Sequence, residues 1–172
     1  MAGNAYVTRM PLGISGAVTR LQDLTAEPAI LDAANPFSKS GLAGKFSGNK
    51  FVSLAAGDTI DKVVGFLIRS YPTTTPTDMK ANGVTAGFTA DIMKRGYMAV
   101  TVPKGQAAAA KKGDKVYIRV DAATADSPLG SVVLTPDATA ANTPELTNAK
   151  VMGPGESLQS STVGHVEIAY NI

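Results

Sequence analysis

The run KVYIRV, residues 115–120, decides the fold class because its apolar and polar side chains alternate. In an extended chain, successive side chains point to opposite faces, so the run divides into two sets. The expected inward set is Val116, Ile118 and Val120, and the expected outward set is Lys115, Tyr117 and Arg119. Such alternation is typical of an antiparallel strand with one face in the core and one face in water.

The same period of two recurs on both sides of this run. Residues 97–102 and 163–170 alternate, and residues 131–135 are expected to form a further short strand. Residues 62–70 hold an apolar, β-branched stretch too short for a helix, which predicts a central strand. We therefore predict a mainly β protein, an antiparallel β-barrel or β-sandwich. Its expected core comprises Val64, Phe66, Ile68, Met98, Val100, Val116, Ile118, Val166 and Ile168.

The N-terminal region predicts a different kind of structure. Between residues 13 and 34, apolar side chains at helical spacing are mixed with Pro28, which interrupts a helix. We expect residues 1–34 to form an extended arm with a short helical turn. Residues 35–172 are then expected to form a single β domain.

Glycine, proline and alanine mark the connections inside this domain. Residues 71–90 and 136–150 are rich in small and polar side chains, so we expect long loops there. Residues 107–110 predict one helical turn, followed by lysines and a glycine stop. Short strands meeting at tight bends are expected around Gly41, Gly44 and Gly48.

Composition narrows the possible functions. The chain has 172 residues, no cysteine, a formal net charge of +2 and only 17% charged residues. Disulfide scaffolds, thiol nucleophiles and cysteine zinc sites are thereby excluded. So even a charge balance predicts weak attraction to nucleic acid and favours self-association. No targeting segment and no apolar stretch of membrane-spanning length is visible, so we expect synthesis in a cytoplasm and no membrane partner.

No set of residues in the sequence predicts catalysis. His165 is the sole histidine, and its place in an alternating strand puts it on the outward face beside Glu167. There is no GxSxG motif, no phosphate-binding glycine loop at residues 41–46 and no calcium-loop pattern. We expect no catalytic residue, cofactor, metal or small-molecule substrate. The basic residues Lys94 and Arg95 are expected in a turn over residues 93–96, where they could contact an acidic partner.

The order of several segments resembles the structural cement proteins of tailed bacteriophages. The segments are VTRLQDL (18–24), EPAIL (27–31), FVSLAAGD (51–58), GFLIR (65–69), RGYMAV (95–100), GDKVYIR (113–119) and VEIAYNI (166–172). The resemblance implies a β-rich decoration protein on the outer surface of the virion head, made in the bacterial host cytoplasm. It also implies that the major capsid protein is the partner, that neighbouring subunits are bridged, and that a trimer is the favoured form of self-association.

The N-terminal segment is the expected principal clamp onto neighbouring subunits. Its apolar residues fit neither a regular helix nor one continuous strand, and on a capsid they could fill pockets while the backbone adds to a strand edge. The alternative is that the segment folds back and completes the protein's own sheet. The candidate interface residues are Tyr6, Val7, Met10, Leu12, Ile14, Lys94 and Arg95.

Two other functions remain open from the sequence. A head-fibre or receptor-binding β module would be expected to expose aromatic side chains, and the chain has five Tyr and no Trp. A hydrolase on a β scaffold would need a catalytic triad that the sequence does not indicate.

Overall fold

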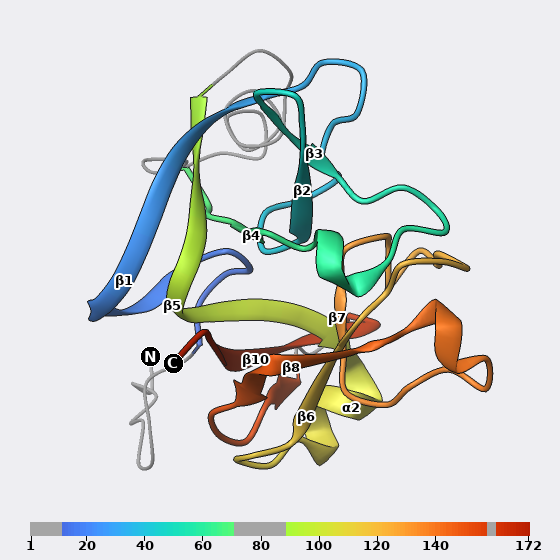
Figure 1. The fold of residues 1–172 in the computed structure, drawn as a ribbon. Helices are drawn as coiled ribbons and strands as arrows, with labels where there is room; N and C mark the ends of the chain where they lie inside the picture. The colour runs from blue at the N-terminus through green and yellow to red at the C-terminus, as the bar shows by residue number, and fades with distance from the viewer. Residues whose placement is uncertain (1–11, 71–88, 158–160) are drawn as a thin grey trace.

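A computed structural model describes residues 12–70, 89–157 and 161–172 of the chain. Strand is by far the most common regular structure in this part, so the expected mainly β class is confirmed (Figure 1). The elements are β1 (Val18–Leu31), β2 (Ala43–Ser47), β3 (Lys50–Ser53), η1 (Ile60–Lys62), β4 (Gly65–Leu67), β5 (Thr89–Pro103), α2 (Lys104–Ala109), β6 (Lys115–Ile118), β7 (Val132–Val133), η2 (Ala140–Asn142), β8 (Glu145–Val151), β9 (Glu156–Ser157) and β10 (Val163–Tyr170).

The strands form one sheet that closes on itself at one end. Strand β1 pairs with β3, β3 with β2, β2 with β4, β4 with β5, and β5 again with β1. From β5 the sheet continues through β10, β8 and β6 to β7. We call β2, β3, β4, residues 25–31 and residues 89–95 the ring region, and α2, β6 to β10 and residues 96–103 the open-sheet region. All pairings are antiparallel except that of β1 with β3.

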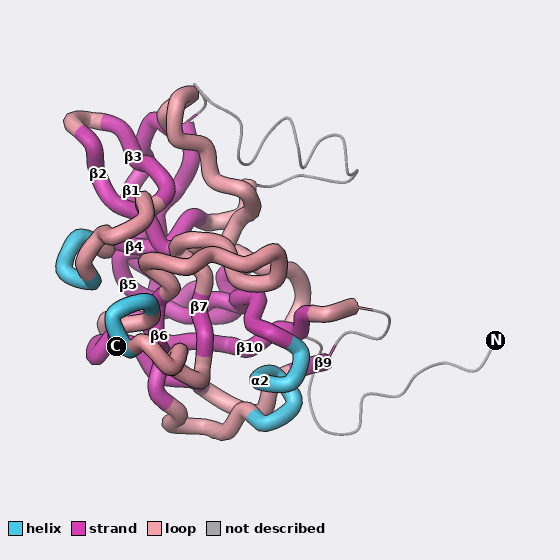
Figure 2. Tube along the Cα trace, turned by 90° about the vertical axis from the view of Figure 1, so that its right-hand side faces the viewer, coloured by secondary structure: helices cyan, strands magenta, loops and turns pink. Residues whose placement is uncertain are grey.

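The ring region lies above the open-sheet region in Figures 1 and 2, and β5 turns a corner between them (Figure 1). The pairing of β5 with β1 is irregular at Gly96. In β1, Arg20 pairs with Tyr97 and Thr25 with Arg95, so residues 21–24 lie opposite the single residue Gly96. The φ angle of Gly96 is 141°, a value that L side chains rarely adopt. A glycine is therefore needed where the two strands turn.

Two clusters of buried side chains form the core, one in each region. The ring region buries Leu31, Phe51, Leu67 and Ile92 with their neighbours. The larger cluster fills the open-sheet region and reaches β4. The predicted core is confirmed in the main, with Phe66, Met98, Val100, Val116, Ile118, Val166 and Ile168 fully buried. Val64 and Ile68 are partly buried against the clusters.

The expected arm is wrong for residues 18–31, which form β1 in the protein's own sheet. No helical turn occurs between residues 13 and 34, because the backbone is instead paired with β5 over most of its length. For this stretch, the fold-back alternative describes the structure. Residues 1–11 lie outside the described residues.

Several connections also differ from expectation. The loop expected at 136–150 contains η2 and most of β8, and residues 89–90 already belong to β5, while residues 71–88 lie outside the described residues. The strand expected at 62–70 shrinks to β4, although it lies between β2 and β5 as a central strand should. The helical turn at 107–110 is confirmed as the end of α2. No helix in the described part of the chain has the length or apolar character needed to cross a bilayer.

Arg119 does not point to solvent as the alternation in residues 115–120 predicts. Its side chain is buried and donates two hydrogen bonds to the Asp137 carboxylate, at 2.8 and 2.9 Å, and one to Ser127 Oγ at 2.8 Å. The segments before and after β7 therefore cover the residue that directly follows β6, while Lys115 at the start of β6 is exposed. The guanidinium also holds the pKa of the Asp137 carboxyl below its usual value by hydrogen bonding.

Candidate interaction surface

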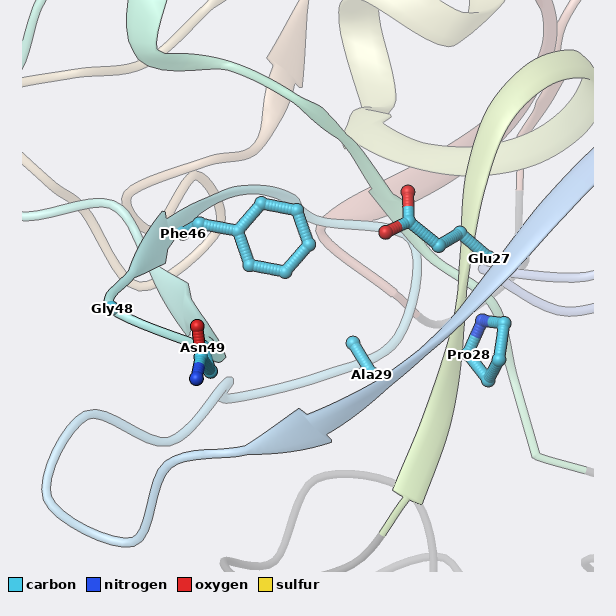
Figure 3. A pocket seen from close by; sticks show the side chains of 6 residues that line it. All are labelled: Glu27, Pro28, Ala29, Phe46, Gly48 and Asn49. Carbon is cyan, nitrogen blue, oxygen red and sulfur yellow. The ribbon is translucent and has the colours of Figure 1, made fainter.

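An open pocket of about 320 Å³ lies on the ring region, between β1 and the β2–β3 hairpin (Figure 3). We call it the hairpin groove. It forms because β1 pairs with β3 only from Ile30 onward, so the preceding residues face the hairpin turn without a strand between them. Its lining residues are Glu27, Pro28, Ala29, Phe46, Gly48 and Asn49.

One aromatic side chain reaches solvent in the hairpin groove. Phe46, which lines the groove, is 36% exposed. The Phe46 ring packs edge to face on Phe51, with centroids 6.0 Å apart, so it has a fixed direction.

One ion pair closes the side of the groove that faces β5. The Lys94 ammonium lies 3.4 Å from the Glu27 carboxylate and 5.5 Å from the centre of the Phe46 ring. Both side chains are substantially exposed, so this pair contributes little to folding. It leaves a charged pair at the rim of the groove, beside the exposed Phe46 ring.

A second apolar projection lies at the corner of β1. Leu21 is 76% exposed at the bulge opposite Gly96. The guanidinium of its neighbour Arg20 donates two hydrogen bonds to the Glu167 carboxylate, at 3.0 and 3.1 Å, and lies 4.2 Å from the centre of the Tyr97 ring. These contacts fix the base of the projection. We call it the β1 corner.

The structure separates the residues predicted as interface. Tyr6, Val7 and Met10 lie outside the described residues. Ile14 is 45% exposed, whereas Leu12 is partly buried and its backbone N–H donates to Glu156 Oε2 at 3.0 Å.

Lys94 and Arg95 lie in β5. The turn expected over residues 93–96 is therefore wrong, because these residues are part of a strand, which changes direction only at Gly96. Met93 is fully buried, because β5 continues through it between β1 and β4. Lys94 belongs to the hairpin groove, and Arg95 is exposed opposite Thr25, next to the β1 corner.

Sequence reasoning missed the hairpin groove, although a signal for it is present. Gly48 and Asn49 form a two-residue loop between β2 and β3, which is a common hairpin sequence. A hairpin in that register pairs Phe46 directly with Phe51, as observed. The contribution of β1 gives no comparable signal, because it depends on pairing between distant segments.

His165 is buried, which corrects the expectation of an outward, solvated ring. It pairs with Glu156 of β9, and the charges of Glu156 and Lys39 both act on it. Burial lowers the pKa of His165, and its Nδ1 has no hydrogen-bond partner among the described residues. No group of three or more potential metal ligands occurs in the described ranges.

Comparison with known proteins gives a family whose model matches this sequence and a solved structure with a similar fold. The family model described as XM1 gp53 minor capsid protein matches residues 3–170. A chain of the solved structure titled "The capsid of Myoviridae Phage XM1" shares this fold, with a TM-score of 0.62 and 20% sequence identity over 96% of each chain. No curated protein shows significant similarity.

These findings place the chain among the capsid-associated structural proteins of bacteriophages. It belongs to the XM1 gp53 minor capsid protein family, because the model spans nearly all of its length. The expected membership of a phage capsid-associated family is thereby confirmed. Membership implies a place in the virion and suggests a structural role rather than a catalytic one.

Proposed function

We propose that this protein is a capsid cement protein. It binds the outer surface of the head, bridges neighbouring major capsid protein subunits and stabilises the DNA-filled shell. The observation that carries this proposal is the presence of two exposed apolar side chains at separate places on one sheet, Phe46 in the hairpin groove and Leu21 at the β1 corner. A bridge requires two separate contacts, and a fixed frame keeps them apart.

Strand β1 sets the distance between the two contacts. Ala29, which lines the groove, lies eight residues after Leu21, and eight residues of strand span at most about 25 Å. This separation allows two subunits to be touched by one molecule. Once the first contact forms, the second becomes effectively intramolecular, so two weak contacts produce firm binding.

The N-terminal segment is a further candidate contact in this proposal. Leu12 is fastened to Glu156, and Ile14 is exposed beside it in the chain. Tyr6, Val7 and Met10 precede this anchored point in the sequence, and we retain them as candidate contacts with the capsid. Trimer formation is also retained, since the low charge density gives little repulsion between copies.

Binding to purified heads that lack the protein tests the proposal. The full-length chain should bind in a fixed icosahedral copy number and raise the temperature at which the heads release DNA. Saturable binding without stabilisation would contradict the cement role and favour the head-fibre alternative. An absence of binding would reject both.

Two variants separate binding from bridging. Phe46→Ser removes the exposed ring of the hairpin groove, and Leu21→Ser removes the exposed side chain of the β1 corner. Each should lose most of the stabilisation of the heads, because either one leaves a single contact. Ala108→Ser, an exposed change on α2, is the control and should behave as wild type. Full stabilisation by both variants would show that bridging uses other surfaces.

A further inference from the structure

Four lysines gather at the end of the open-sheet region that lies away from the β2–β3 hairpin. They are Lys111 and Lys112 after α2, Lys115 at the start of β6, and Lys150 in β8. In Figures 1 and 2, α2 and β6 lie at the bottom of the molecule and the hairpin at the top. All four are exposed. We call them the lysine cluster.

Backbone hydrogen bonds hold these lysines together. The Gly113 N–H donates to the Val151 carbonyl at 2.8 Å, and the Val151 N–H donates to the Asp114 carbonyl at 3.1 Å. In the register that follows, Lys115 lies directly opposite Lys150. Like charges at directly opposite positions destabilise a strand pair. The fold therefore tolerates a repulsive pair on an exposed surface.

Local carboxylates leave most of this charge uncompensated. Glu145 accepts a hydrogen bond from Lys115 Nζ at 2.8 Å, which raises the pKa of Lys115 above its usual value. The Asp114 carboxylate accepts the backbone N–H of Lys111 at 2.8 Å. Within residues 12–70, 89–157 and 161–172, Lys111, Lys112 and Lys150 form no ion pair.

Four lysines elsewhere in the described chain are paired with carboxylates. Lys45 and Lys62 pair with Asp58, Lys50 with Asp32, and Lys94 with Glu27, whereas Lys39 and Lys104 form no ion pair within the described residues. A chain with a formal net charge of only +2 thus places three lysines without an ion pair, Lys111, Lys112 and Lys150, together at one end. The contrast indicates a surface prepared for a negative partner.

We propose that the lysine cluster docks onto an acidic face of a capsid subunit, a different subunit from the one that the hairpin groove contacts. This inference rests on the proposed cement function. The cluster and the groove lie at opposite ends of the molecule, so one subunit face need not serve both. Charge complementarity selects the partner, because a like-charged or neutral face would gain nothing from three unpaired ammonium groups. A protein face fits better than DNA, since so few phosphate contacts would bind weakly at physiological salt.

The test compares two triple variants of the full-length chain on purified heads that lack the protein. Lys111→Glu, Lys112→Glu and Lys150→Glu reverse the charge, and the same three positions changed to Arg keep it. At low salt the Glu variant should bind about tenfold or more weakly, and the Arg variant should match wild type. Wild-type binding should fall as NaCl rises from about 50 to about 300 mM, while that of the Glu variant stays nearly flat.

Thermal unfolding of the free protein separates a docking role from a structural one. Lys150→Glu places an acid opposite Lys115, so the Glu variant should unfold at the same temperature or a higher one. A clearly lower unfolding temperature would show that the cluster serves the fold and overturn the inference. Equal binding of the Glu variant and wild type to heads would overturn the inference and leave the cement function standing.

Two controls identify the partner. Failure of the wild-type chain to bind heads would reject the proposed function itself, and with it this inference. A short duplex DNA is the competing probe under the same salt conditions. If the duplex bound wild type as tightly as the heads do, and the Glu variant lost both, the acidic protein face would be the wrong partner.

Discussion

The ring region closes on itself, whereas the open-sheet region ends at β7, and the two regions bury their strands to different extents. In β1, which completes the ring, most residues are exposed. In β10, at the centre of the open sheet, almost all are buried. The ring region therefore relies on backbone pairing around a small core, and the open-sheet region on burial of side chains. Exposed contact sites are compatible with the first arrangement, which explains why the hairpin groove lies there.

The proposed difference between the two regions is tested most directly by a substitution at the centre of the ring core. Phe51→Ala removes a fully buried ring that stacks on Phe37 with centroids 4.8 Å apart. We expect a loss of about 4 kcal/mol in the free energy of unfolding, measured by urea denaturation. Hydrogen exchange should accelerate first in β2 and β3. Equal acceleration in β8 would show that the two regions do not differ in local stability.

The matching change in the open-sheet region is Ile118→Ala. Ile118 is fully buried in the larger cluster, and we expect a loss of about 3 kcal/mol by the same measurement. Because β5 is shared, both variants should still unfold in one transition with the wild-type dependence on urea. A second transition in either variant would mean that the regions are independent units.

A change of pH tests the junction between the regions. Burial tends to raise the pKa of Asp58, but hydrogen bonds from Lys45, Lys62 and the Ala55 N–H outweigh it and lower the pKa from 3.8 to about 2. The backbone N–H of Gly57, the residue before Asp58, donates to the Val120 carbonyl at 3.1 Å. This hydrogen bond connects the loop to the open-sheet region.

A carboxyl whose pKa is lower in the folded state stabilises the fold above its usual pKa, and this stabilisation is lost as the pH falls toward 2. Asp58→Asn should therefore cost about 2 kcal/mol near neutral pH, and the difference from wild type should shrink below about pH 4. Urea denaturation at several pH values measures it. A difference that is the same at every pH would place the effect in packing rather than in charge.

The smallest effect on stability is expected at the rim of the hairpin groove. Lys94→Ala breaks an exposed ion pair with Glu27, so the free energy of unfolding should change by less than about 0.5 kcal/mol. Its binding to heads should weaken if the groove is a contact surface. Unchanged binding together with unchanged stability would remove Lys94 from the interface.

The strands of the open-sheet region were predictable because their apolar residues alternate. Val116, Ile118 and Val166 are buried as the period of two requires. The opposite faces were not predictable, since the pattern does not show what covers a polar residue. Arg119 is buried against Asp137, 18 residues further on, and His165 pairs with Glu156 of a separate short strand, so the alternation within each strand carries no information about what covers them.

The ring region was less predictable for a related reason. Strand β1 is long and mostly exposed, it contains Pro28, and its partner residues in β5 lie about 70 positions away, as in the pairing of Thr25 with Arg95. Its register depends on backbone pairing across that distance rather than on a hydrophobic pattern. The hairpin itself could be predicted from Gly48 and Asn49, but not the groove that β1 completes.

Strand β5 crosses from one region to the other without a break, and this continuity determines how the molecule would carry mechanical tension. A pull between the two ends passes along a single covalent backbone through the corner at Gly96. Beyond the corner, β5 is paired with β10 from Gly96 to Pro103, and antiparallel hydrogen bonds run across the strand direction. Tension along β5 therefore loads these bonds in shear, all at once. Strands pulled in shear resist separation more strongly than strands peeled apart bond by bond, so the sheet resists tension that is applied along β5.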